Sequence, residues 1–335
     1  MSQKKYFYTV LMFVSILCLQ AQDMQFSQYY SAPLFINPAL TGASVCHRLS
    51  SNIRTQWPGT GKGYVSEVVS YDHFDINHSI GYGAMITNDQ AGTGNLRTTG
   101  LTGSFAYEAT INRRFAFRAG AQAGFFQRSV NMSKLLFGDQ IARGGSDVSS
   151  FEIPNPSVTY PDFNVGALGY SKDYWIGLAV HHLFKPEESL LGSTAGLPRK
   201  ISVQAGKRFY LTGGEDKPGD HDAWIVMPTF NYRHQAKFDQ LDIGCYFSRS
   251  VVTFGLWYRG IPILKGYKPG YPNNDALVFL VGMSADRLHI GYSYDVTISW
   301  LTMKSRGAHE LSISYQACTL KPKKKRSPIV SCPKF

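Results

Sequence analysis

The sequence contains few charged residues and no long apolar run after its first residues. Asp, Glu, Lys and Arg make up 17% of its 335 residues, below the roughly 25% that is usual in soluble globular domains. Beyond residue 21, no apolar run reaches the roughly 18 residues that a membrane-spanning helix needs. These absences exclude helical membrane spans. With 14% aromatic residues and 32 Gly, the composition fits a membrane β-barrel with aromatic girdles, although it also fits a large soluble β-sandwich.

Motifs of catalysis and of metal binding are also missing. The sequence has no His-Glu-x-x-His, no Gly-x-Ser-x-Gly and no Cys-x-x-Cys. His181 and His182 are neighbours in a predicted strand, where successive side chains point to opposite faces, so they cannot easily share a metal. Part of the formal net charge of +11 lies in residues 321–326, without a basic helix or a zinc-finger spacing. We therefore expect no enzyme, no cofactor, no metal site and no nucleic-acid partner.

The N-terminus has the pattern of a secretory signal peptide. Two lysines precede an apolar run over residues 10–19, and Ala21 offers a small residue for cleavage. We expect residues 1–21 to be removed, so that the mature chain begins at Gln22.

Four cysteines remain after this cleavage: Cys46, Cys245, Cys318 and Cys332. An exported protein enters an oxidising compartment, and four cysteines allow three complete pairings, which the sequence does not rank. The nearest pair, Cys318 and Cys332, would stabilise the fold by ~3 kcal/mol in the chain-entropy model. Cys245, on an apolar strand face, is also explained as a small hydrophobic residue.

Period-two alternation runs through the mature chain. Leu288, Ile290 and Tyr292 alternate with polar or small residues, which is typical of a strand with one apolar face. Most of the segments with this pattern have the length that a tilted membrane strand needs, about 9–11 residues. The predicted strands are 48–57, 63–75, 78–88, 96–111, 115–130, 163–171, 174–184, 200–211, 223–235, 240–249, 251–260, 275–285, 288–299 and 308–318.

The connections between these strands alternate between short and long. Bacterial barrels have short periplasmic turns and longer outer loops. Short turns include Ile76-Asn77, Lys172-Asp173 and Asp286-Arg287, and Thr212–Asp222 is an exception because it should be short and is not. The expected longer loops are 58–62, 89–95, 131–162, 185–199, 236–239, 261–274 and 300–307. A sandwich has no reason to alternate in this way, so the pattern favours a barrel.

We therefore predict an all-β protein with a closed antiparallel transmembrane β-barrel of outer-membrane type, with about 14 strands over residues 48–318. The sheet must close because lipid cannot satisfy an open edge, and an even number of strands puts both chain ends on the periplasmic side. Residues 22–47 have no strand pattern, and we interpret them as a periplasmic N-terminal segment that can fold back as a plug. Residues 319–335 form a basic periplasmic tail, which we interpret as solvated.

Two of the long loops carry apolar and aromatic side chains, which often mark partner surfaces when they are exposed. An alternative is that these loops fold into the barrel mouth. The candidate partner-binding residues are Leu135, Leu136 and Phe137 in the first loop and Ile263, Leu264, Tyr267 and Tyr271 in the second.

The two ends of the mature chain resemble one known family. Gln25-Phe26-Ser27-Gln28-Tyr29 comes shortly before Asn37-Pro38-Ala39 and Gly42, and the chain closes on Cys332-Pro333-Lys334-Phe335 after a basic stretch. This pattern resembles the opening and the terminus of the PorP/SprF family of type IX secretion system membrane proteins. Leu40 stands where the family usually has an aromatic residue. The residues of the opening pattern are candidates for either a structural plug or a partner contact.

The resemblance implies an outer-membrane barrel of the secretion or gliding machinery that binds, anchors or assists the export of surface proteins. Its partners would be secretion-system components, a secreted surface protein with a C-terminal signal domain, and outer-membrane lipid. Two other interpretations remain open, a passive porin-like channel for small solutes and a surface enzyme.

Overall fold

The fold comes from a computed structural model. It describes residues 23–60, 63–92, 94–112, 114–145, 149, 156–190, 192, 196–211, 223–268, 271–299 and 305–318. The predicted signal peptide, the basic tail with Cys332, and the connection Thr212–Asp222 lie outside these residues. No helix within the described ranges is long and apolar enough to cross a membrane.

Antiparallel strands form the wall of the molecule, and short helical turns precede or connect them. The strands are β1 (His47–Gln56), β2 (Tyr64–Asp75), β3 (Ile80–Ala91), β4 (Leu96–Thr110), β5 (Phe115–Ser129), β6 (Ser157–Ser171), β7 (Tyr174–His181), β8 (Lys200–Lys207), β9 (Phe209–Tyr210), β10 (Ile225–Gln235), β11 (Phe238–Arg249), β12 (Val252–Lys268), β13 (Tyr271–Ala285), β14 (Leu288–Thr297) and β15 (Ala308–Ala317). The helical turns are η1 (Tyr29–Ser31), α2 (Pro33–Ile36), η2 (Pro38–Leu40), η3 (Pro58–Thr60), η4 (Met132–Lys134) and α3 (Gly138–Ala142).

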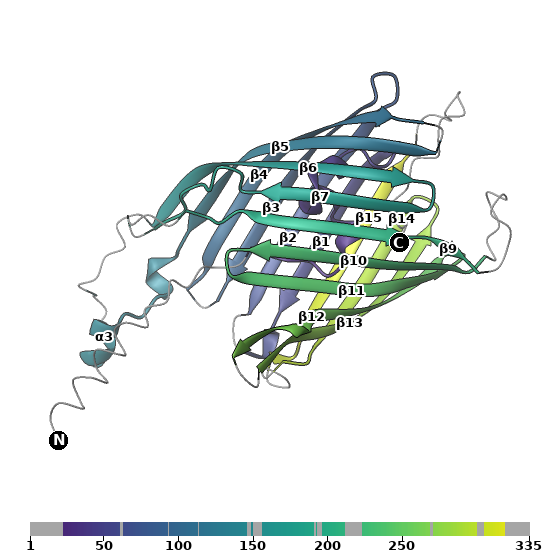
Figure 1. The fold of residues 1–335 in the computed structure, drawn as a ribbon. Helices are drawn as coiled ribbons and strands as arrows, with labels where there is room; N and C mark the ends of the chain where they lie inside the picture. The colour runs from purple at the N-terminus through teal and green to yellow at the C-terminus, as the bar shows by residue number, and fades with distance from the viewer. Residues whose placement is uncertain are drawn as a thin grey trace.

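The sheet closes on itself (Figure 1). β1 pairs with β15 over the whole register from His47↔Ala317 to Gln56↔Ala308, and β10 pairs with β11. β8 and β9 both pair with β10 and are two parts of one strand, so fourteen strands surround the lumen. The predicted closed antiparallel barrel of about 14 strands is confirmed.

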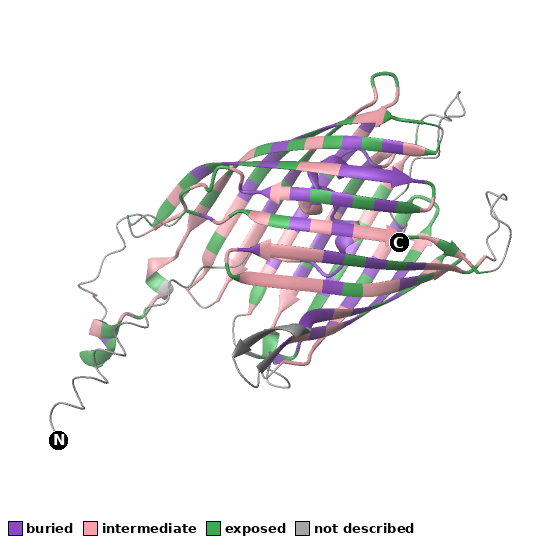
Figure 2. Ribbon diagram, in the orientation of Figure 1, coloured by how far each residue is buried: buried purple, intermediate pink, exposed green. Residues whose placement is uncertain are grey.

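Burial alternates along the strands of the wall (Figure 2), because apolar residues lie exposed on the outside and polar residues lie buried inside. On β1, Leu49 and Ile53 are 51% and 44% exposed, whereas Ser50, Asn52 and Arg54 are buried. This arrangement is the reverse of a soluble protein, where the apolar face points inward. A wall with an apolar outer surface and a polar interior is that of a barrel in a membrane.

The two ends of the barrel differ. The loop end carries the connections 57–63, 130–156 and 182–199, and the turn end carries the tight connections 172–173 and 286–287. This difference follows the predicted alternation in part, because the connection 236–237 at the loop end is also short.

Residues 23–45, here called the lumenal segment, run inside the barrel (Figure 1, purple). The segment starts at Asp23 beside Lys200 and Gln235, at the loop end. It ends at the turn end, where Cys46 leads into β1. We expected both chain ends on the side of the short turns, and this expectation is wrong for the start of the segment. The reason is that the segment itself crosses the lumen once, which adds one passage to the even number of strands.

Two predicted long loops belong to the wall. β12 and β13 extend through most of 261–274, with register shifts at Arg259/Gly260 and Ile261/Gly266 that mark bulges. Ile263, Leu264 and Tyr267 therefore lie on β12, and Tyr271 lies on β13. The predicted loop 236–239 is a tight turn, because β10 ends at Gln235 and β11 begins at Phe238.

One disulfide joins Cys46 to Cys318, whose Cα atoms are 4.5 Å apart. The two cysteines lie directly beyond the paired residues His47 and Ala317, so the closure of the barrel brings them together. The possible bond between Cys318 and Cys332 is therefore not formed, because Cys318 is bonded to Cys46. Sequence proximity was a poor guide, because the bond follows the register of the first and last strands.

Candidate functional site: the lumenal segment and its polar network

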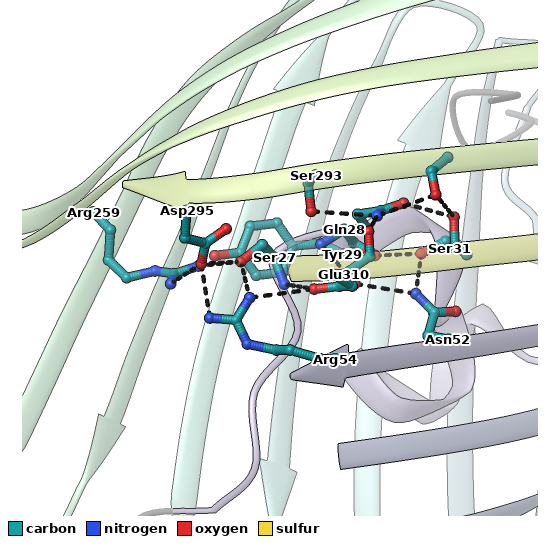
Figure 3. A network of polar contacts seen from close by, with 12 residues as sticks. Ser27, Gln28, Tyr29, Ser31, Asn52, Arg54, Arg259, Ser293, Asp295 and Glu310 are labelled. Atoms are coloured by element: carbon teal, nitrogen blue, oxygen red, sulfur yellow. Dashed lines mark hydrogen bonds and ion pairs between the residues drawn. The ribbon is translucent and has the colours of Figure 1, made fainter. Parts of the chain in front are cut away.

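Ser27 stands at the centre of a buried polar network (Figure 3). Its hydroxyl donates to Asp295 Oδ2 at 2.7 Å and accepts from Arg54 Nη1 and Arg259 Nη2, each at 2.8 Å. Its backbone N–H donates to Glu310 Oε2 at 2.6 Å. The hydroxyl thus uses its one donor and both acceptor positions. Groups from four strands, β1, β12, β14 and β15, converge on this single residue of the lumenal segment.

Gln28 fastens the next position to β14 and β15. Its amide nitrogen donates to the carbonyl of Glu310 at 2.9 Å and to Ser293 Oγ at 3.3 Å, and its amide oxygen accepts from Ser312 Oγ at 2.6 Å. A Cβ at Gly291 would collide with this amide, which explains why the wall has no side chain there. The side chain of Gln28 is fully buried, so it acts as a bridge between segment and wall.

Buried ion pairs surround these contacts. Arg54 and Arg259 bind Asp295 at 2.7 and 2.9 Å, and Arg259 and Arg233 bind Asp242 at 2.7 and 2.8 Å. Desolvated charges of this kind are tolerated only when they are paired and hydrogen-bonded, and removal of one partner costs about 3–5 kcal/mol. The network therefore fixes the position of the segment more than it adds net stability.

Asn37 attaches the middle of the segment to the opposite part of the wall. Its amide nitrogen donates to the carbonyls of Ala167 on β6 and Leu178 on β7, both at 3.2 Å. Its amide oxygen accepts from the backbone N–H of Ala39 at 2.9 Å and so caps η2. A Cβ at Gly166 would overlap this oxygen. One side chain thus orders the local turn and ties it to two strands.

Gly42 marks the attachment at the turn end. Its N–H donates to Asp72 Oδ2 at 2.7 Å, and Arg48 binds both oxygens of the same carboxylate at 2.8 Å. Arg118 donates to the carbonyls of Thr41 and Gly42. Gly42 has a φ of +67° and a Cβ there would meet the backbone of the wall, so both conformation and space require glycine.

Aromatic rings fill the lumen between these polar attachments. Tyr29 packs edge-on against Trp257 at 5.3 Å between centroids, and Tyr30 packs against Trp175 and Tyr246 at 5.8 and 5.7 Å. Tyr246 and Trp257 also contact each other at 5.1 Å. Edge-to-face pairs in this distance range are favourable beyond their buried area. The segment therefore contributes side chains to a core inside the barrel.

Asp23 anchors the start of the segment at the loop end. It accepts from Lys200 Nζ at 2.6 Å and Gln235 Nε2 at 3.0 Å, and it lies 2.8 Å from His182 Nε2. Burial alone would raise the pKa of Asp23, but His182 and Lys200 hold it well below its ordinary value. Burial would lower the pKa of His182, but Asp23 and Asp162 raise it to about 9. Both groups are therefore charged near neutral pH and form a charged clamp.

The structure brings part of the predicted site together. All seven candidates from the opening pattern lie in the lumen: Gln25, Phe26, Ser27, Gln28, Tyr29, Asn37 and Pro38. Leu135, Leu136 and Phe137 lie apart from them, between η4 and α3 on the connection at the loop end, with Leu136 64% exposed. Ile263, Leu264, Tyr267 and Tyr271 are separated again, on the extended β12–β13 hairpin.

Sequence reasoning missed the wall half of the network. Arg54, Arg259, Asp295 and Glu310 were not singled out, although each lies on a strand whose alternation points it inward. Ionisable residues on the polar face of membrane strands were the available signal. Their partners could not be read, because the lumenal segment has no period that predicts which strand each residue faces. In the part of the chain that the structure describes, no group of three or more His, Cys, Asp or Glu is placed to hold a metal.

Comparison with known proteins identifies the family. The model of the type IX secretion system membrane protein family PorP/SprF matches residues 19–315, which include the lumenal segment and nearly all of the wall. The chain belongs to the PorP/SprF family. The family resemblance seen in residues 25–42 is thus confirmed, and the barrel of this PorP/SprF protein is an outer-membrane barrel.

Other comparisons are weaker. No curated protein matches the chain. Among solved structures, this PorP/SprF protein is similar to the Pseudomonas putida toluene transporter TodX, with 11% identity, a TM-score of 0.48, and coverage of 89% of this chain and 95% of that one. It is also similar to the Acinetobacter baumannii outer membrane protein Omp33, with 6% identity, a TM-score of 0.43, and coverage of 82% and 100%. Likenesses of this size say nothing of what this PorP/SprF protein binds or conducts.

Proposed function

We propose that this PorP/SprF protein is a plugged, non-catalytic outer-membrane barrel that binds, anchors or assists the export of surface proteins in the type IX secretion and gliding machinery. Its loop end would face the outside, as the longer loops of bacterial barrels do. Its partners would be secretion-system components and the C-terminal signal domain of a secreted surface protein. The single observation that carries this proposal is the lumenal segment, which occupies the interior that a channel would need.

The contacts of the lumenal segment argue against the passive porin-like channel. For a solute to pass, Ser27 and Gln28 would have to leave their hydrogen bonds to Glu310, and Asn37 would have to leave the carbonyls of β6 and β7. Water would replace the lost partners in an open lumen, so each of these hydrogen bonds favours the closed state by about 0.5–1.5 kcal/mol. Several such losses at once make an open state rare, so the lumenal segment acts as a plug.

A filled barrel leaves its loop end as the surface for protein partners. On the connection between β5 and β6, Leu136 and Ile141 are 64% and 62% exposed. Exposed apolar side chains in a loop at the barrel mouth suit a protein contact better than free solvent. This contact would use the loops and leave the plug in place.

The test is carried out in cells that lack the gene and carry variants of it. Replacing Leu136 and Ile141 together by Ser should remove a secreted surface protein from the cell surface and from material that co-purifies in mild detergent. Permeability to small antibiotics should stay unchanged. Val251→Ser, at the turn end and 46% exposed, is the matched control and should behave as the wild type. Normal surface display with the loop variant would contradict this proposal, and reduced uptake of small solutes on deletion of the gene would favour the channel instead.

A further inference from the structure

A cavity opens at the loop end, beyond the start of the lumenal segment. Its volume is about 440 Å³, and Asp23, Met24 and Gln25 contribute to its lining. This volume lies in the range of small-ligand pockets, roughly 300–1,000 Å³. Of the contacts described above, only the clamp of Asp23 with His182 and Lys200 borders this space, so the cavity is separate from the aromatic core of the plug.

Aromatic rings line the cavity. Phe126 and Tyr160 stack at 5.9 Å with an interplanar angle of 13°, and Trp57 packs edge-on against Tyr64 at 5.6 Å. The faces of aromatic rings carry partial negative charge and attract cations. These rings also offer an apolar surface on which an aliphatic stem can lie.

The charged groups around the cavity leave one carboxylate over. Arg128 pairs with Glu188 at 2.5 Å, Lys200 pairs with Asp23 at 2.6 Å, and His182 pairs with both Asp23 and Asp162, at 2.8 and 2.9 Å. Asp89 also lines the cavity, and among the described residues it makes no direct ion pair, although Arg128 attracts it from a greater distance. It accepts a hydrogen bond from Ser66 Oγ at 2.5 Å. The cavity can therefore accept one further positive charge.

Three buried side chains that line the cavity have polar atoms without a partner among the described residues. They are Thr87 Oγ1, Asp162 Oδ1 and Gln122 Nε2, and each residue is at most 3% exposed. Buried polar atoms are normally hydrogen-bonded, so each such atom calls for an explanation. These atoms add polar character to the cavity wall, but they are themselves buried, so the groups open to a ligand are Asp89 and the aromatic rings.

We propose that this cavity binds a positively charged nitrogen group at the end of an apolar stem, an alkylammonium or a guanidinium. The cation would lie near Asp89 and the aromatic faces, and the stem would lie along the rings. Two sources present this chemistry, a free alkylamine or the Lys or Arg side chain of a peptide. An anion is disfavoured because its charge would approach Asp89, and an uncharged alkyl chain would leave the Asp89 carboxylate without a partner cation.

Calorimetric titration of the full chain in mild detergent tests this site. The probes are hexylammonium, hexanol and hexanoate, which share one stem, and the peptides acetyl-Ala-Lys-Ala-amide and acetyl-Ala-Leu-Ala-amide. At least one cationic probe should bind about tenfold more tightly than its uncharged or anionic counterparts. Tighter binding of the lysine peptide identifies a basic side chain as the source, and tighter binding of hexylammonium identifies a free amine.

Two variants make the result specific. Asp89→Asn should weaken the cationic probes about tenfold or more, and Asp286→Asn, on an exposed turn at the other end of the barrel, should leave them unchanged. Heat-modifiable gel migration checks that each variant is folded. Equal binding of hexanol and hexylammonium, no binding of any cation, or no effect of Asp89→Asn would each overturn the proposal. These outcomes leave the proposed function standing, because neither the plug nor the exposed loop uses Asp89.

Discussion

Replacing Arg54 by Leu should release the lumenal segment while leaving the barrel closed. The substitution removes the ion pair with Asp295 at 2.7 Å, the longer pair with Glu310 at 3.5 Å, and a hydrogen bond to Ser27 at 2.8 Å. Asp295 keeps Arg259 as a partner, but Glu310 loses its paired cation in a fully buried position. Breaking a buried pair in this way costs about 3–5 kcal/mol. At about 1.4 kcal/mol per tenfold change, the equilibrium between seated and released segment shifts by roughly 100- to 4,000-fold.

Hydrogen–deuterium exchange measures this shift. The backbone N–H groups of Ser27 and Gln28 donate to Glu310 in the wild type, so they should exchange slowly there and much faster in Arg54→Leu. Strand amides should change little, because their ladder does not involve Arg54's side chain. The matched control is Arg287→Leu at an exposed turn, where the ion pair with Asp286 spans 3.8 Å and is worth at most about 1 kcal/mol.

A second substitution checks the reasoning behind the magnitude. Glu310→Gln in the Arg54→Leu background removes the orphaned negative charge but keeps an amide oxygen that accepts from Ser27. The double variant should therefore recover part of the lost protection. Equal exchange in Arg54→Leu and in the Arg287→Leu control would refute the claim that this network holds the segment. No recovery in the double variant would refute the role of the orphaned charge.

The remaining predictions concern the two ends of the lumenal segment and its middle. The contribution of His182 to holding the start of the segment should be complete below pH 6.5, its ordinary pKa, and should be lost as the pH rises through its raised pKa of about 9. The contribution of Asp23 should be complete above pH 3.8, its ordinary pKa, and should be lost as the pH falls through its lowered pKa. Exchange at the start of the segment, corrected for the intrinsic rate, should rise outside this window, and an unchanged profile in His182→Gln would contradict the clamp. Mass spectrometry of unreduced peptides should find Cys46 joined to Cys318, a bond worth about 5 kcal/mol in the chain-entropy model; a bond between Cys318 and the tail would contradict it. Gly166→Ala should cost about 1–3 kcal/mol in thermal unfolding of the full chain but little in a chain without residues 23–40, and equal costs in both would exclude the contact with Asn37.

The barrel wall was predictable because its signal is local. Alternation of side chains repeats every two residues, so the predicted strand 96–111 differs from β4 by one residue. β6 begins at Ser157, six residues before the predicted start at 163. Pro161 contributed to that error, since prolines suggest loops, but here it lies on the exposed outer face of a strand. Period-two patterns thus predict which side chains face inward or outward better than they predict where each strand begins and ends.

The interior was not predictable in the same way. Residues 23–45 have no period, and each of their contacts joins positions far apart in sequence, such as Ser27 and Asp295. The Cys46–Cys318 bond depends on the register of β1 against β15, which only closure of the barrel establishes. The opening pattern pointed to the right residues, but only the three-dimensional wall shows what they contact.

The most direct test of the central claim, that the lumenal segment fills the barrel, is conductance in planar lipid bilayers. The full chain should show no stable open channel, whereas a chain that lacks residues 23–40 and retains Cys46 should show steady ion conductance. Folding of both proteins is checked by heat-modifiable migration before the recording. Steady conductance of the full chain, equal to that of the shortened chain, would contradict the account.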